Sequence, residues 1–85
     1  MFKSGSLDDI DYWKRSGNNN IQDRITRLLK SIAANPETGI GKPEKLKGDL
    51  SGLWSRRINK EHRIIYKVDS ISKIVTIYSL KGHYI

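Results

Sequence analysis

Four side chains of types that suit chemistry on a phosphate are spread over the second half of the chain. They are the carboxylate of Glu44, the guanidiniums of Arg57 and Arg63 and the imidazole of His83, for which a solvated position near the terminus is the simpler explanation. Glu44 lies among lysines in the segment GKPEKLKG (41–48), where it could act as a general base beside a phosphate-bearing substrate. A solvated turn of mixed charge is the simpler explanation of the same segment.

The charge of the chain favours a polyanionic partner. The formal net charge is +7, and it is unevenly distributed. Residues 1–41 carry six Lys and Arg against five Asp and Glu, whereas residues 42–85 carry ten against four. A basic excess confined to one half predicts a directed positive surface, such as a nucleic acid requires. An anionic membrane surface or an acidic protein would also fit.

Several classes of protein are disfavoured by composition. A chain of 85 residues predicts one domain, spanning 1–85. There is no cysteine, and His62 and His83 do not stand in a metal-binding spacing, so neither a metal site nor a cofactor is expected. No apolar run approaches the roughly 20 residues that span a bilayer, and the N-terminus lacks the apolar core of a signal peptide. The expectation is a soluble cytoplasmic protein without membrane contact.

The first half of the chain predicts two helices, over 6–15 and 21–34. Apolar residues recur at helical spacing in both, most regularly in the second. Each begins with two polar residues in the spacing of a capping box: Ser6 with Asp9, and Asn20 with Asp23. Because only the polar stretch 16–20 separates them, the helices should form an antiparallel hairpin.

The second half predicts strands. Residues 53–58, 62–68 and 73–80 are rich in β-branched and aromatic residues and are separated by connections of hairpin length. The fold class is therefore α+β, with an N-terminal antiparallel helical hairpin packed on one face of a small, mostly antiparallel sheet. The segment 40–52, which joins helix to sheet, is interpreted as a functional connection. The opposite face of the sheet is left for chemistry.

The strand arginines pose a problem of register. Arg56 is interpreted as a solvated charge, since adjacent strand residues point to opposite faces. Arg57 and Arg63 together favour a phosphate site. A plain two-residue turn would pair Ile58 with Arg63 and place Arg57 and Arg63 on opposite faces. One site for both therefore requires an extra residue or a bulge.

A long stretch of the sequence resembles a known family. Residues 39–68, GIGKPEKLKGDLSGLWSRRINKEHRIIYKV, and the late HY at 83–84 resemble the YoeB toxins of bacterial toxin–antitoxin modules, within the RelE-like group of microbial ribonuclease-like folds. The chain departs from the family at its ends. Only MFK stands where a short apolar strand is usual, Gly82 replaces a frequent aromatic, and Ile85 follows the usual terminal tyrosine.

The resemblance implies a metal-independent, ribosome-dependent endoribonuclease that cleaves messenger RNA in the A site through the substrate's 2′-hydroxyl. The catalytic residues would be Glu44 as base, Arg63 as phosphate ligand and His83 as acid. The residues expected to bind substrate are Lys47, Arg57 and Tyr84, with Lys42 and Lys45 adding salt-dependent affinity for the backbone.

The resemblance also implies partners. A YefM-type antitoxin would hold the toxin inactive, operator DNA would be bound only through the antitoxin complex, and a homodimer is a further option. Two other functions remain open: a ParE-like toxin that acts on DNA gyrase without cutting RNA, and a non-catalytic module that binds RNA or the ribosome.

Overall fold

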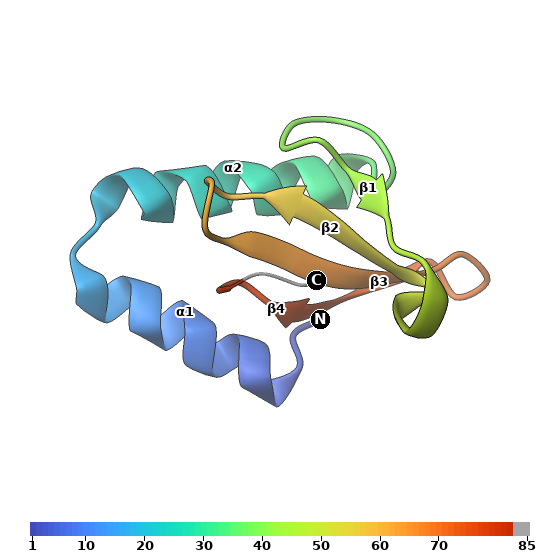
Figure 1. The fold of residues 1–85 in the computed structure, drawn as a ribbon, viewed down its shortest axis with the longest axis horizontal. Helices are drawn as coiled ribbons and strands as arrows, with labels where there is room; N and C mark the ends of the chain where they lie inside the picture. The colour runs from blue at the N-terminus through green and yellow to red at the C-terminus, as the bar shows by residue number, and fades with distance from the viewer. Residues whose placement is uncertain (83–85) are drawn as a thin grey trace.

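Two helices followed by a four-stranded antiparallel sheet make up the fold (Figure 1). The computed structural model describes residues 1–82. The elements are α1 (Ser4–Ser16), α2 (Asn19–Ala34), β1 (Glu44–Lys45), the short 3₁₀ helix η1 (Gly48–Leu50), β2 (Leu53–Arg57), β3 (Arg63–Asp69) and β4 (Ile74–Ser79). The strands are ordered β1-β2-β3-β4, and the helices cover one face of the sheet. The predicted α+β class and its helical hairpin are confirmed.

The helix α1 begins earlier than the sequence predicted. Its N-cap is Lys3, which makes no side-chain cap, and the hydroxyl of Ser6 donates to the Lys3 carbonyl from within the first turn (2.6 Å). The predicted capping box of Ser6 and Asp9 was therefore wrong. The backbone of Lys3 is already fixed, because its N–H donates to the Ile77 carbonyl of β4 (2.9 Å). This long-range bond sets the start of the helix.

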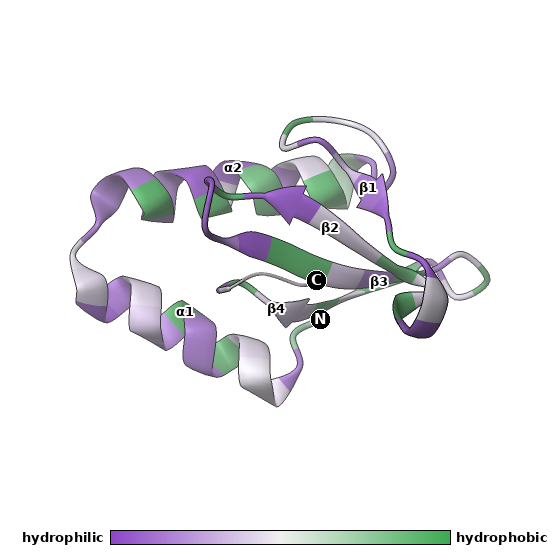
Figure 2. Cartoon of the chain, in the orientation of Figure 1, coloured by the Kyte–Doolittle hydropathy of each residue, from purple (hydrophilic) through white to green (hydrophobic). Residues whose placement is uncertain are grey.

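The helix α2 also begins before its predicted cap. Asn18, not Asn20, is the N-cap, and its Oδ1 accepts from the N–H of Ile21 at 3.2 Å. The apolar stripe behaves as predicted, and hydrophobic positions recur at regular intervals along the helix (Figure 2). The helix ends before Asn35, which precedes a proline and has extended backbone angles.

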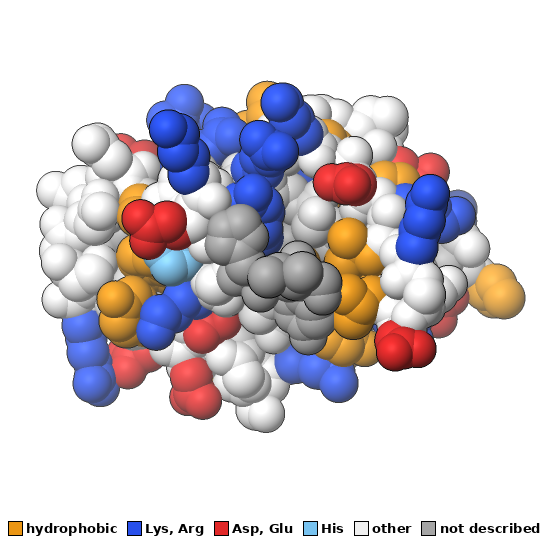
Figure 3. All heavy atoms as spheres, viewed as in Figure 1, with side chains coloured by type: hydrophobic (Ala, Val, Ile, Leu, Met, Phe, Trp, Pro, Cys, Tyr) orange, Lys and Arg blue, Asp and Glu red, His pale blue; other side chains and the backbone are white. Residues whose placement is uncertain are grey.

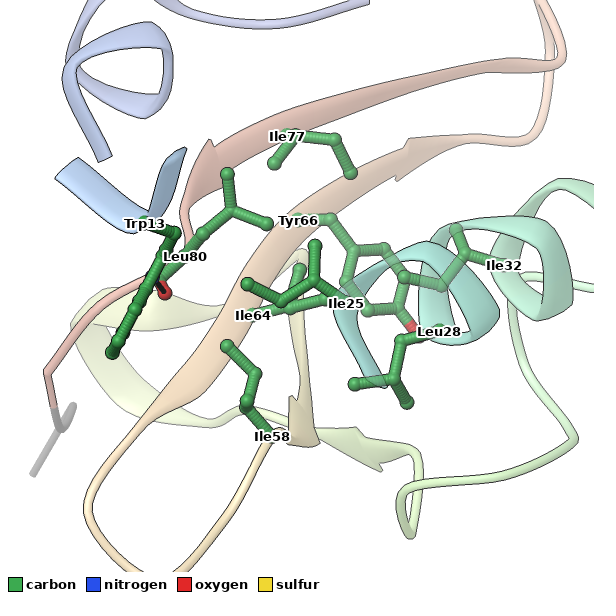
Figure 4. Packing of buried hydrophobic residues seen from close by; sticks show 9 residues of the cluster. All are labelled: Trp13, Ile25, Leu28, Ile32, Ile58, Ile64, Tyr66, Ile77 and Leu80. Atoms are coloured by element: carbon green, nitrogen blue, oxygen red, sulfur yellow. Dashed lines mark hydrogen bonds between the residues drawn. The ribbon is translucent and has the colours of Figure 1, made fainter. Parts of the chain in front are cut away.

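The core lies between the helices and one face of the sheet (Figure 4). Its buried members come from α1, α2, β3, β4 and the loops that follow β2 and β4: Trp13, Ile25, Leu28, Ile32, Ile58, Ile64, Tyr66, Ile77 and Leu80. Complete burial of one such side chain stabilises the fold by about 1.5–3 kcal/mol. The helices occupy only this face. The opposite face bears Arg57 and Arg63 at one end of β2 and β3 and the buried Ile65 and Ser55 beside them; it is called the open face below.

Each edge of the sheet has a feature that the periodicity did not reveal. Within the predicted connection 40–52, Glu44 and Lys45 pair with β2 as an edge strand, too short to produce an alternating pattern. At the other edge, the Ile77 N–H donates to the Met1 carbonyl (2.8 Å), and Phe2 forms a parallel bridge to Ile77. The N-terminal strand usual in the resembling family is thus shortened to one bridge. Within residues 1–82, no helix is both long and apolar enough to cross a membrane.

Candidate functional site

The register of β2 and β3 brings two predicted site residues together. Arg57 is directly opposite Arg63, so both side chains lie on the open face. The loop between them has five residues, Ile58 to His62, in place of a two-residue turn. Asn59 closes this loop, because its Oδ1 accepts the N–H groups of Glu61 and His62, each at 2.8 Å. The extra residues that a shared site requires are therefore present.

Glu44 belongs to the same face. It is paired with Ser55, which stands two residues before Arg57 on β2. Paired residues share a face of a sheet, and so do residues two apart on one strand. Glu44, Arg57 and Arg63 therefore line the open face from three successive strands. Strands lie about 4.8 Å apart, so roughly 10 Å of sheet separates β1 from β3, with Arg57 between them.

The guanidinium of Arg63 is oriented by the loop that precedes it. Its Nη1 donates to the carbonyls of Asn59 (2.6 Å) and His62 (3.1 Å) and, more weakly, Lys60 (3.4 Å). A guanidinium has further N–H groups on Nε and Nη2. A donor whose orientation is fixed before a ligand arrives needs little reorganisation when charge develops nearby.

The lysines of the 41–48 segment do not all reach the open face. Lys42 and Lys47 are exposed on either side of β1. Lys45 is paired with Trp54, whose side chain packs against the core, so Lys45 lies on the opposite face from Glu44. In the space-filling view, Lys and Arg side chains form a column over the end of β2 (Figure 3). The basic excess predicted from the sequence is thus partly concentrated beside the predicted site.

His83 and Tyr84, the other predicted site residues, lie outside the described residues. The described chain nevertheless approaches the site at its last position. The carbonyl of Gly82 accepts from the backbone N–H of Arg63 at 3.0 Å. His83 therefore follows, in sequence, a residue that is bonded directly to the start of β3.

Arg56 is the residue that the sequence interpretation missed. It was taken as a solvated charge, but its side chain is fully buried on the helix side of β2. Its partners are the hydroxyls of Tyr66 and Ser31 and the carbonyls of Asn35, Thr38 and Ile40, at 2.7 to 3.1 Å. These contacts use all five N–H groups of the guanidinium. The charge is buried among neutral acceptors, each of which is satisfied by it.

Arg56 draws the loop 35–41 onto the core, and this loop leads to β1. Close packing continues at Gly41, where a Cβ atom would stand 2.6 Å from Leu28 Cδ2 on a backbone with φ +84°. The Gly41 carbonyl accepts from the Arg57 N–H at 2.7 Å. The position of Glu44, three residues later, therefore depends on a buried arginine. The alternation of strand residues was the one signal that could have placed Arg56 inside.

Tyr66 completes this buried network. Its hydroxyl accepts from Arg56 Nε (3.0 Å) and donates to the Pro36 carbonyl (2.6 Å). Burial raises the pKa of the Tyr66 phenol above its ordinary value, and the hydrogen bond and charge of Arg56 oppose that rise. The phenol is therefore neutral and structural. Among residues 1–82, no three His, Cys, Asp or Glu side chains stand close enough together to hold a metal ion.

Comparison with known proteins gives the family. The model of the YoeB-like toxins of bacterial type II toxin–antitoxin systems matches residues 2–84. The chain belongs to this family. It is 42% identical over 84 residues to the toxin YoeB of Escherichia coli K12, covering 99% of this chain and 96% of that protein. Two of the solved structures that match over 99% of the chain illustrate the shared fold. One is a YoeB/ParE toxin from Agrobacterium tumefaciens (TM-score 0.91, 36% identity, 96% of that chain), and the other is a YoeB–YefM complex from Staphylococcus aureus (0.85, 45%, 94%).

Proposed function

We propose that this YoeB-like toxin is an endoribonuclease that cuts messenger RNA in the ribosomal A site. The observation that supports the proposal is the shared face of Glu44, Arg57 and Arg63. These residues come from three strands, and their convergence depends on the five-residue loop before β3. A carboxylate on the same face as two guanidiniums combines a proton acceptor with donors for a phosphate.

In the proposed reaction the nucleophile is the 2′-hydroxyl of the RNA. Glu44 removes its proton as the oxygen attacks the adjacent phosphorus. Arg63, already oriented by the loop, and Arg57 donate hydrogen bonds to the phosphoryl oxygens as negative charge develops. His83 donates a proton to the departing 5′-oxygen. The bond from phosphorus to that oxygen breaks, leaving a 2′,3′-cyclic phosphate on one fragment and a 5′-hydroxyl on the other.

Other residues would hold the substrate. Lys42 and Lys47 are exposed near Glu44 and are suited to phosphates of the RNA backbone. Tyr84 would stack on an unpaired base, as aromatic side chains do in sites for single-stranded RNA. Lys45 lies on the other face of β1, so its share in the affinity would come from long-range attraction.

The antitoxin is a second part of the proposal. A structure from Staphylococcus aureus contains YoeB bound to YefM, and another contains a YoeB dimer. We infer that this chain likewise binds a YefM-type antitoxin, whose acidic and apolar segment would cover the basic side and fold as it binds. Self-association, and contact with operator DNA through the antitoxin complex, belong to the same proposal.

The test replaces the proposed base and the proposed acid one at a time. Glu44→Gln and His83→Ala should each lower cleavage on translating ribosomes by about 10²–10⁴ while leaving the circular dichroism spectrum unchanged. Asp49→Asn is the matched control for Glu44→Gln, since it removes an equal charge from the exposed η1 turn and should cleave normally. Primer extension should show cuts in register with codons. Full activity of Glu44→Gln, or a gyrase supercoiling defect without RNA cuts, would refute the nuclease.

A further inference from the structure

The end of the described chain is held by side chains of α1. Asp9 and Trp13 stand four residues apart, on one face of the helix. Asp9 Oδ2 accepts from the Leu80 N–H at 2.9 Å, and Trp13 Nε1 donates to the Leu80 carbonyl at 2.8 Å. Both backbone polar groups of a fully buried residue are thus bound by side chains. This anchors the chain two residues before Gly82.

Both backbone polar groups of Gly82 are also bound, one by a side chain and one by the backbone of β3. Its N–H donates to Nδ1 of His62 at 2.9 Å, and its carbonyl accepts from the Arg63 N–H at 3.0 Å. Its φ of +85° is accessible to glycine without strain. Between the two anchors, the ammonium of Lys81 lies 3.8 Å from the centre of the Tyr12 ring.

The His62 ring is itself fixed in place. Its side chain is 19% exposed, and the ring packs edge-on against Trp13 at 4.9 Å between centroids. Nδ1 can accept from Gly82 only without a proton of its own, so in the neutral imidazole the proton is on Nε2. The carboxylate of Glu61 lies 4.0 Å from Nε2, on the side of the ring that carries this proton. The contacts of His62 therefore select one tautomer and one orientation.

We propose that His62 is a positioning residue, which holds the Gly82 amide and so fixes the point from which His83 extends. The catalytic part of this inference rests on the proposed nuclease function, in which His83 is the general acid. The same sequence of three residues, Glu61 to Arg63, then supplies a phosphate ligand and the anchor of the acid. A displacement of a catalytic group by about 1 Å can cost about 10² in rate.

The first experiment measures the anchor without any need for activity. Amide hydrogen exchange of the whole purified chain is followed by NMR in the wild type, His62→Ala and His62→Asn. The asparagine variant is the conservative one, because its side-chain Oδ1 can accept a hydrogen bond from the same branch position as the imidazole Nδ1. The Gly82 amide should exchange about tenfold faster or more in His62→Ala and stay protected in His62→Asn.

The Leu80 amide is an internal control in the same spectra, since it donates to Asp9 and should remain protected in both variants. If the Gly82 amide is equally protected in His62→Ala, the inference is overturned. If Leu80 and core amides lose protection together with Gly82, the substitution has loosened the fold as a whole, and the behaviour of His62→Asn decides the question.

The second experiment asks whether His62 acts through His83. His62→Ala should lower cleavage by about 10- to 100-fold, and His62→Asn should restore most of it. In a His83→Ala background, His62→Ala should cause no further loss. An equal loss in both backgrounds would overturn the positioning role. If the wild type cuts no RNA at all, the proposed function fails, whereas the exchange experiment still decides whether His62 holds Gly82.

Discussion

Substitutions at the neighbouring residues Arg56 and Arg57 should have different effects on the stability of the fold and on the rate of cleavage. Arg56 is fully buried and bonded to five acceptors, whereas Arg57 is exposed on the open face. Replacing each by lysine keeps the charge and removes the planar fork of donors. We expect Arg56→Lys mainly to lower the free energy of unfolding, with any effect on cleavage passing through the position of Glu44. We expect Arg57→Lys to slow cleavage with little effect on the free energy of unfolding.

The magnitude for Arg56→Lys follows from its hydrogen bonds. An ammonium has three N–H groups, so at least two of the five acceptors lose their partner. A buried acceptor without a partner costs about 1–3 kcal/mol, which gives about 2–6 kcal/mol for two. Since the three carbonyl acceptors are only partly buried, water can replace some of these bonds, and about 2–4 kcal/mol is expected. The whole domain is stable by only about 4–13 kcal/mol.

Urea unfolding followed by tryptophan fluorescence measures this change, because Trp13 is buried in the core. Arg57→Lys should stay within about 0.5 kcal/mol of the wild type, as exposed substitutions usually do. It should instead slow RNA cleavage by about tenfold, the effect of losing one hydrogen bond of about 1.4 kcal/mol in the transition state. Equal stability of Arg56→Lys and the wild type would refute the structural role. Normal cleavage by Arg57→Lys would refute its contact with the phosphate.

Three further substitutions test the framework around the site. Gly41→Ala should destabilise the fold, since its Cβ would stand 2.6 Å from Leu28 Cδ2 on a strained backbone; thermal unfolding measures this. Tyr66→Phe should be less stable than the wild type at neutral pH. Because burial raises the pKa of the Tyr66 phenol, the folded state keeps a proton that the unfolded state loses above about pH 10, so the wild-type advantage should shrink with rising pH in urea titrations. Asp69→Asn should remove a pH dependence of the opposite sign, in which stability is lost as the pH falls. Backbone N–H groups lower the pKa of the Asp69 carboxyl, so its contribution is present above the ordinary carboxyl pKa and is lost as the pH falls through the lower folded value.

The elements that could be predicted from the sequence are those with a local signal. The stripe of α2 and the β-rich segments identified both helices, three strands and the α+β class, because periodic burial is written into neighbouring residues. Glu44 and Arg63 were found as candidate site residues by their chemical type and by the resemblance. The need for extra residues before Arg63 followed from strand alternation alone, and the loop supplies them.

The features that could not be predicted depend on partners distant in sequence. Lys3 begins α1 because it is bonded to Ile77, and Asp9 binds Leu80 across 71 residues where a local cap was expected. Arg56 resembles its neighbour Arg57 in every local respect, but only Arg56 meets a ring of carbonyls. Those carbonyls come from a loop whose sequence has no periodic pattern, so their contacts with Arg56 could not be predicted from it.

The two ends of the proposed site are held in place in the same way. Glu44 stands on a two-residue edge strand, which has too few ladder bonds to hold itself, and Arg56 fixes the loop that leads to it. Gly82 lies beyond the last strand, where a chain tends to fray, and His62 binds it directly before His83. In both cases a side chain from the β2–β3 hairpin, or the loop within it, binds backbone of a segment with little regular structure. Catalytic groups on such segments can act only if contacts of this kind limit their motion, so we expect Arg56 and His62 to affect cleavage through position alone.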